Sequence, residues 1–313
     1  MVHKHKWIEA APHERLTKAA RRALRSRLEL VAHHLPEAAK SDALEPEAVH
    51  QLRVSTRRAW AALACYGEVL PQKAGDWMRK QVKRIRKAAG DARDLDVLAA
   101  RLRGDASHDG ADWQDLLAHI DKCRQRARQP VAELWQRLKA RHFQRRIRKL
   151  VQGVRWRRAC HDGDEPSFAE AARDRIREAS DAFFIASSGD LSDLSALHEF
   201  RILGKRLRYA MELNHAAFGP EFRDELYPQM EEVQEKIGAT IDHAAAIDRF
   251  EDWLAHWDDS RLTAPIQQLL ADERTALAAS RHEFGLWWTD ERAKQFQRRF
   301  DDALTQPFVE RVA

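Results

Sequence analysis

The sequence has few residues that break helices and no long apolar run. Among its 313 residues are only 12 Gly and 10 Pro, which favours a highly helical globular chain over a loop-rich or disordered one. No segment approaches the ~20 consecutive apolar residues that a membrane span needs, and the N-terminus lacks the apolar stretch of a signal peptide. We therefore expect a cytoplasmic protein that makes no membrane contact.

Cysteine is also scarce. The chain has three cysteines, Cys65, Cys123 and Cys160, with no CxxC or CxxH spacing. An odd number without such spacing predicts neither a disulfide framework nor a zinc site. We expect reduced thiols, no metal ligands and no cofactor.

Sequence patterns typical of phosphate-transferring enzymes are missing. The chain contains no GxxxxGK[ST] and no GxGxxG, which excludes the usual nucleotide-binding loops. The tripeptide HDG occurs at 108–110 and 161–163, but both copies look like loops and lack further His and Asp at useful spacing. We identify no catalytic residue and expect a protein that is not an enzyme.

What the sequence does contain is helical periodicity. Apolar residues recur at spacings of three and four, and the alternation typical of strands is absent. A polar Gly/Pro stretch at 160–167 reads as a linker. The fold class is therefore predicted to be all-α, with long helices in the segments 13–35, 46–70, 75–102 and 111–154.

The two halves of the chain repeat each other. A shift of 148 residues without a gap pairs His50 with His198 and Arg53 with Arg201. The register continues far along the chain, where it also pairs Arg58 with Arg206, Gly90 with Gly238, Asp94 with Asp242 and Arg101 with Arg249. A register held this long predicts two tandem helical bundles, 1–159 and 160–313, related by pseudo-symmetry.

Cations gather on one side of two helices in the first repeat. His50, Arg53 and Arg57 fall within a helical sector of about 60°. Residues 49–93 hold eleven Lys/Arg against three Asp/Glu, whereas 197–241 hold six against eight. Such faces are usually solvated and held by acid–base pairs, but acids are scarce here, so stacked like charges need an anion for neutralisation. The second of these helices contributes Arg79, Lys80, Lys83, Arg86, Lys87 and Arg93.

These features resemble the CHAD domain, the conserved histidine α-helical domain. The shared pattern is HxxR followed by a basic pair, duplicated, with GDARDLDVL after the second helix of the first copy, and it covers roughly residues 10–305. The resemblance implies two antiparallel four-helix bundles around a pseudo-twofold axis. It also implies a basic surface that binds inorganic polyphosphate, often on polyphosphate granules in bacteria.

Carried over residue by residue, the resemblance assigns polyphosphate contacts to both copies. In the second copy Glu231 and Glu235 stand where the first has Lys83 and Lys87, which puts a symmetric surface in doubt. Asp94 and Asp242 are interpreted as structural partners of a helix end or an arginine. The full predicted set joins the family positions His50, Arg53, Arg57, Arg58, His198, Arg201, Lys205, Arg206 and Arg208 to the basic face Arg79, Lys83, Arg86 and Lys87.

Three alternatives remain at this stage. The two histidines could orient neighbouring arginines by hydrogen bonding instead of contacting ligand. Nucleic acid is the rival partner, because segment 141–158 interleaves cations with Phe143 and Trp156. A granule scaffold that recruits a partner protein also fits. Hydrolysis of triphosphate, known for relatives with an attached domain bearing an ExExK motif, is not expected because that motif is absent.

Overall fold

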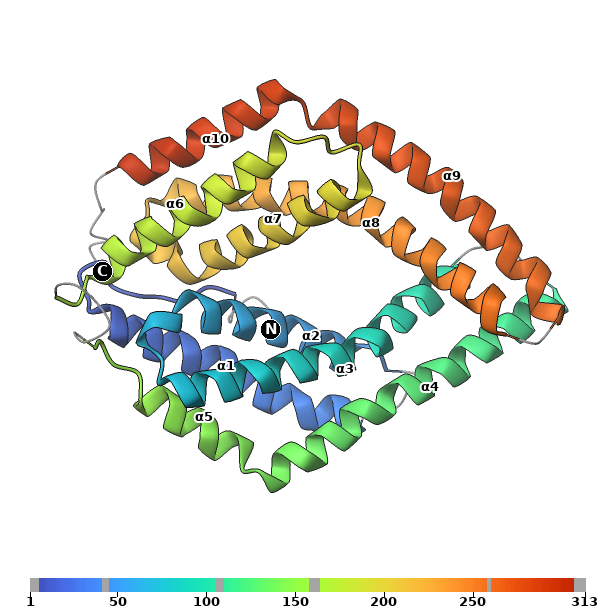
Figure 1. Cartoon of the computed structure of the whole chain (residues 1–313), viewed down its shortest axis with the longest axis horizontal. Coiled ribbons are helices and arrows are strands. Elements are labelled where there is room, and N and C mark those ends of the chain that lie inside the picture. Colours follow the sequence, from blue (N-terminus) through green and yellow to red (C-terminus); the bar gives the residue numbers. More distant parts are fainter. Residues whose placement is uncertain (1–5, 41–44, 105–109, 158–163, 258–259, 307–313) are drawn as a thin grey trace. The chain divides into compact units, whose positions relative to one another are not determined.

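The computed structural model describes residues 6–40, 45–104, 110–157, 164–257 and 260–306. In these residues the regular structure consists of helices, with no extended strand (Figure 1). The predicted all-α fold class is confirmed. None of the helices described is both long enough and apolar enough to span a bilayer.

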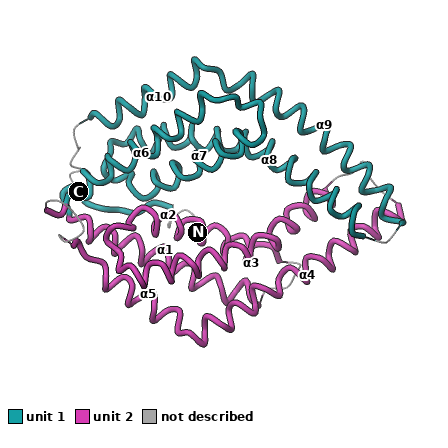
Figure 2. Tube along the Cα trace, viewed as in Figure 1, with its two compact units in different colours: residues 1–14, 166–313 teal, residues 15–165 magenta. Residues whose placement is uncertain are grey.

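The chain forms two compact units (Figure 2). Unit 2 comprises residues 15–165, and unit 1 combines residues 1–14 with residues 166–313. Unit 1 is therefore built from two separate stretches of sequence. The predicted repeat limits, 1–159 and 160–313, stay a prediction, since the junction itself lies outside the described residues.

Unit 2 is a bundle in which α2 packs between α1 and α3. Helix α4 packs on α3 and α1, and α5 packs on α1 and α3 (Figure 1). Its core is formed by fully buried aliphatic side chains such as Leu24, Leu63 and Val82. Its helices are α1 (Leu16–Lys40), α2 (Glu47–Cys65), α3 (Gln72–Gly104), α4 (Ala111–Ala140) and α5 (Phe143–Gln152).

Unit 1 has the same order of helices but a more aromatic core. Helix α7 packs between α6 and α8, α9 packs on α8, and α10 packs on α6. Phe183 of α6 stacks on Phe200 of α7 with ring centroids 4.6 Å apart. A π-helical turn, Phe222–Leu226, leads into α8. Its helices are α6 (Phe168–Ser187), α7 (Leu194–Asn214), α8 (Tyr227–His256), α9 (Thr263–Trp287) and α10 (Asp290–Thr305).

The helix positions follow the register of the sequence repeat. Adding 148 to the bounds of α2 gives 195 and 213, against 194 and 214 for α7. The same addition to α5 gives 291 and 300, which fall within α10 at 290–305. Each helix of unit 2 thus has a counterpart in unit 1 at the expected place along the chain. The pseudo-twofold relation between the copies remains a prediction.

The single helix expected over 111–154 is wrong. The segment divides into α4 and α5 at His142, whose φ of 54° lies in the left-handed region. An α-helix cannot continue through that conformation, although histidine adopts it more readily than most residues. Because neither glycine nor proline marks the break, apolar periodicity runs across it unchanged.

Residues 6–14 belong to unit 1 although they come first in the chain. The Trp7 ring lies 4.7 Å from Tyr227 and 4.8 Å from His215, measured between ring centroids. The Lys6 ammonium pairs with Glu231 at 3.0 Å, and the Ile8 amide donates to the Glu212 carbonyl at 3.3 Å. These contacts fasten the N-terminal segment across the end of α7 and the start of α8.

Candidate functional site

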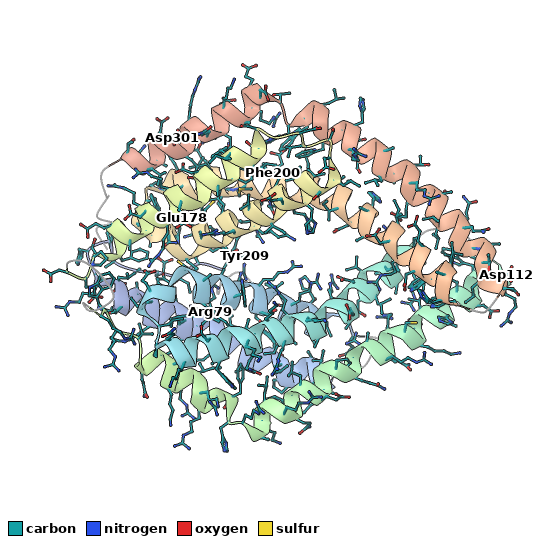
Figure 3. All side chains as sticks on the ribbon, in the orientation of Figure 1. Arg79, Asp112, Glu178, Phe200, Tyr209 and Asp301 are labelled. Atoms are coloured by element: carbon teal, nitrogen blue, oxygen red, sulfur yellow. The ribbon has the colours of Figure 1, made fainter. Side chains whose placement is uncertain are left out.

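Helices α2 and α3 run antiparallel and bring their predicted basic residues onto one face of unit 2. The Arg86 guanidinium lies over the Trp60 ring, 5.2 Å from its centroid. Two turns earlier on α3, Arg79, labelled in Figure 3, donates to the Leu63 carbonyl at 3.4 Å and pairs with Asp76 at 2.8 Å. This register also places Arg57 opposite the segment that carries Lys87. We call the side chains of His50, Arg53, Arg57, Arg79, Lys83, Arg86, Lys87 and Arg93 the α2–α3 basic face.

An arginine, a glycine and an aspartate meet at one end of this face. Arg53 Nη2 pairs with Asp94 at 3.1 Å, and a Cβ on Gly90 would lie only 3.3 Å from Arg53 Nη1. Glycine therefore clears the space through which the guanidinium crosses α3. At Gly238 the corresponding distance to Arg201 Nη2 is 3.7 Å, an ordinary contact, so the close approach belongs to the first copy. The predicted arginine partner of Asp94 is confirmed.

Other cations of the face have no such carboxylate. Within the described part of the chain, Arg57, Lys83, Lys87 and Arg93 form no ion pair. Lys83 and Lys87 are exposed, whereas Arg57 and Arg93 are half-buried. Like charges one helical turn apart destabilise a helix by about 0.2–0.5 kcal/mol per pair. A polyanion laid on this face would remove that repulsion.

His50 is half-buried among these cations. Burial lowers the pKa of its imidazole below the ordinary 6.5, and the charges of Arg93, Arg57 and Arg53 lower it further, against an opposing effect of Glu47. No hydrogen bond to the His50 ring occurs within the described residues. The imidazole is therefore a neutral group in a positive environment, and it does not orient an arginine by hydrogen bonding. Arg58, one residue beyond Arg57 and turned about 100° from it, is half-buried.

The corresponding arginines of unit 1 are all engaged by acids or by buried polar groups. Arg201 pairs with Asp242 at 3.2 Å, which reproduces the Arg53–Asp94 pair. Arg206 Nη2 lies 2.6 Å from Glu178, which reaches from α6 (Figure 3). The predicted site residues of unit 1 thus lie on α7, but acids on α6 and α8 offset much of their charge.

Arg208 is held most firmly. Its Nη1 donates to the Tyr227 hydroxyl at 3.1 Å and lies 3.4 Å from the Glu231 carboxylate. The Tyr227 hydroxyl in turn donates to the buried Glu212 at 2.8 Å. Arg208 therefore stabilises the junction that also receives Lys6. Of the remaining predicted positions, Lys205 is half-buried and His198 is exposed.

Sequence reasoning did not anticipate three of these partners. Glu178 lies on a different helix from Arg206 and is separated from it by 28 residues, with no shared motif. Trp60 of α2 is partly exposed and lies beneath the Arg86 guanidinium, a contact that no local pattern indicates. Glu212 lies one helical turn after Arg208, and that spacing is a usable signal for an ion pair.

The family model of the CHAD domain matches residues 22–251, well over half of the chain. The chain belongs to the CHAD-domain family. Two uncharacterized proteins of Mycobacterium tuberculosis, MT2285 and Rv2226, are each 29% identical to this CHAD-domain chain over 182 residues. That match covers 55% of the chain but only 34% of each relative, so the chain spans about a third of their length.

Two solved structures share the fold. The CHAD domain from the plant Ricinus communis matches with a TM-score of 0.70 at 20% identity, covering 88% of this chain and 94% of that one. PptA from Streptomyces chartreusis matches with a TM-score of 0.58 at 19% identity, and the match covers 90% of this chain and 100% of that one. At these identities the similarity establishes the fold of this CHAD-domain protein.

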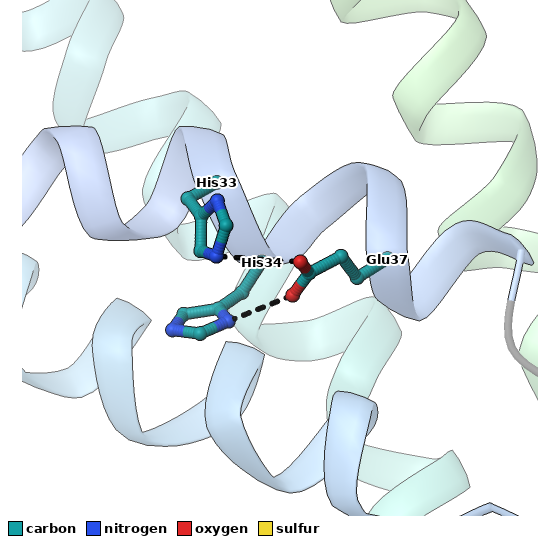
Figure 4. A group of neighbouring side chains, drawn as sticks. All are labelled: His33, His34 and Glu37. Atoms are coloured by element: carbon teal, nitrogen blue, oxygen red, sulfur yellow. Dashed lines mark hydrogen bonds and ion pairs between the residues drawn. The ribbon is translucent and has the colours of Figure 1, made fainter. Parts of the chain in front are cut away.

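One group of potential metal ligands occurs in the described part of this CHAD domain. His33, His34 and Glu37 lie within one turn of α1 (Figure 4). The Glu37 carboxylate contacts both imidazole rings, with its oxygens 3.3 Å from His33 Nε2 and 3.2 Å from His34 Nδ1. Glu37 thus already satisfies one nitrogen of each imidazole, and the group is separate in sequence from the α2–α3 basic face.

Proposed function

We propose that this protein binds inorganic polyphosphate without hydrolysing it, and that the α2–α3 basic face is its principal contact. The observation that carries the proposal is the set of cations on that face, Arg57, Lys83, Lys87 and Arg93, that lack carboxylate partners among the described residues. Membership of the CHAD family supports the same ligand class. The α7 cations of unit 1 contribute a weaker second set, because acids offset them.

Polyphosphate matches this face chemically. The ligand carries about one negative charge per phosphate unit, and its flexible chain can follow a row of cations. Arginine forks bind two phosphate oxygens at once, and lysines add point charges. By analogy with nucleic acids, each contact releases a counterion, so affinity should fall steeply with salt.

Nucleic acid is the second candidate, and the aromatic residues argue against its single-stranded form. Sequence-tolerant binding of single strands uses exposed aromatic rings on which bases stack. Phe143, Trp113 and Trp253 are buried, with 2%, 5% and 6% exposure. The more exposed Trp60 lies beneath the Arg86 guanidinium. The face therefore offers charge without an open stacking platform.

A polyphosphate-binding surface would also direct the protein to polyphosphate granules. Granules of polyphosphate concentrate many copies of the ligand, and several weak contacts along one chain give high avidity. We propose granule association on this basis, with recruitment of a partner protein as a compatible further role. Pulldown from cells with and without accumulated polyphosphate tests both, because a granule-dependent partner appears only in the first sample.

The decisive experiment is a competition titration with purified full-length protein. Long-chain polyphosphate should displace labelled ligand at lower concentration than single- or double-stranded nucleic acid of matched charge and salt, and orthophosphate should compete poorly. Tighter binding of nucleic acid would overturn the proposal. A parallel assay with magnesium or manganese should detect no phosphate release. Turnover that survives repurification and disappears on mutation of acidic residues would overturn the non-enzymatic assignment.

A further inference from the structure

A second, separate concentration of positive charge lies on α5. Residues 134–161 contain ten Lys/Arg and no Asp or Glu. Helix α5 buries Phe143, Ile147, Leu150 and Val151 and exposes its basic residues on the opposite side. Because the apolar side already packs within unit 2, the basic side is the surface that α5 offers to solvent.

Three of these cations form one exposed stripe. Arg145, Arg148 and Lys149 lie at spacings of three and four, within a helical sector of about 100°. None of the three forms an ion pair with another described residue. The counterpart helix α10 has Ala293, Phe296 and Gln297 at the positions shifted by 148. The stripe therefore belongs to unit 2 alone and is not part of the duplicated pattern.

A groove between α3 and α4 lies beside the start of α5. The groove has a volume of about 470 Å³, and Arg84, Arg137 and Arg141 line it together with Leu134 and Leu138. Glu133 also lines it and pairs with Arg137 at 2.9 Å. Arg84 and Arg141 form no ion pair with a described residue. Arg141 joins the groove to α5, because its carbonyl accepts a bond from Arg146 Nε at 3.1 Å.

Two aromatic residues near this surface, Phe143 and Trp77, are closed to bases. Phe143 is 2% exposed, and the Arg146 guanidinium covers Trp77 at 4.6 Å from its centroid. A ligand held here is therefore recognised through its phosphates.

We infer that α5 and the adjoining groove form a second polyphosphate-binding surface, which engages chains long enough to reach it from the α2–α3 basic face. This inference rests on the proposed function. Helix α2 packs against α1 and α3, and α5 packs against the same two helices from beyond them (Figure 1). One chain must pass around the bundle to touch both surfaces. Binding the second surface is then intramolecular, which raises avidity for long chains only.

The test is a full-length variant with Arg145→Gln, Arg148→Gln and Lys149→Gln. Its affinity for tripolyphosphate should stay within about twofold of the unmodified protein, while its affinity for chains of about 100 units falls roughly tenfold and its salt slope by about two. A control with Lys122→Gln, Lys294→Gln and Arg298→Gln removes three exposed cations elsewhere and should change neither. Circular dichroism and thermal melting verify that both variants fold.

Every outcome decides the inference. Unchanged long-chain affinity in the α5 variant, or equal losses for short and long chains, would overturn it while leaving the α2–α3 basic face intact as the main site. A loss confined to duplex DNA would assign the surface to nucleic acid and also overturn it. If the unmodified protein bound neither length of polyphosphate, the proposed function would fail as well.

Discussion

The helix pair α2–α3 of unit 2 and the helix pair α7–α8 of unit 1 hold the same arginine, glycine and aspartate but differ in the cations around them. Arg53 pairs with Asp94 at 3.1 Å and Arg201 with Asp242 at 3.2 Å. In unit 2 the neighbouring Lys83 and Lys87 are exposed and have no acid partner among the residues that the structure describes, whereas unit 1 has glutamates in their place. The shared triad therefore serves the architecture, and the surrounding charge determines which copy attracts a polyanion.

The strongest test removes equal charge from both copies. Arg57→Ala, Lys83→Ala and Lys87→Ala should weaken polyphosphate binding on the order of 100-fold and lower the salt slope by about two to three, because no described acid competes for these cations. Arg201→Ala, Lys205→Ala and Arg206→Ala should cost about fivefold or less by the same reasoning. Titration at several salt concentrations measures both. Arg208 is left in place because it holds Tyr227 and Glu231.

This comparison needs a folding control. Both variants must show unchanged helicity by circular dichroism, since Arg201→Ala and Arg206→Ala leave Asp242 and Glu178 without their partners. A greater or equal loss from the unit 1 set would contradict the assignment. It would mean that paired arginines exchange their carboxylates for phosphate at little cost.

Exchanging the charges at the corresponding positions 87 and 235 should change polyphosphate affinity by a smaller factor. Glu235 of α8 stands in the register of Lys87, is exposed, and is not among the partners of the Lys6 and Arg208 network. Glu235→Lys should raise polyphosphate affinity by about threefold to fivefold, and Lys87→Glu should lower it by more, because each changes the local charge by two. Glu283→Lys on α9 is the matched control. If it raises affinity as much, net charge alone accounts for the effect.

The smallest expected difference concerns the two histidines. Bound polyphosphate should raise the pKa of His50, which burial and its arginine neighbours hold below 6.5 in the free protein. The complex then binds more protons than the free protein, so affinity rises as pH falls from 7.5 to 5.5, by about twofold for a rise of about 0.3 in that pKa. Calorimetry in buffers of different ionisation enthalpy measures the proton uptake.

His50→Gln should remove that proton uptake, whereas His198→Gln on the exposed counterpart should largely preserve it. Equal pH dependence in the two variants would exclude His50 as the titrating group. The same low pKa has a consequence for folding. A histidine whose folded pKa is depressed stabilises the protein fully above its unfolded pKa of ~6.5, and that contribution is lost as pH falls.

Much of the helical order follows from the sequence. The 148-residue register predicts where along the chain each helix of one unit has its counterpart in the other, because apolar spacing and the Gly and Asp positions are local features of the chain. The break at His142 is not visible in the sequence, since the apolar pattern continues from α4 into α5 across a left-handed residue. Periodicity reports which residues face the core, but not whether the backbone between them stays helical.

The partners of the cations were harder to predict than their positions. Helical geometry alone places Arg53 and Arg57 on one side of α2. Nothing local indicates that Glu178 reaches Arg206 from another helix, or that Arg86 covers Trp60. Such pairings depend on how helices cross, so a charge count along a segment identifies the basic copy without identifying which of its charges remain available.

The packing of residues 6–14 on unit 1 affects the order in which the chain folds during its synthesis on the ribosome. The ion pair of Lys6 with Glu231 cannot form until the ribosome has added Glu231, which lies 225 residues later. At synthesis rates of 5–20 residues per second, that delay is roughly 11–45 s. Unit 2 is a continuous segment, and all of it is made before unit 1 receives its last helices. Unit 2 can therefore fold first, while the Trp7 side chain stays exposed until Tyr227 and His215 become available.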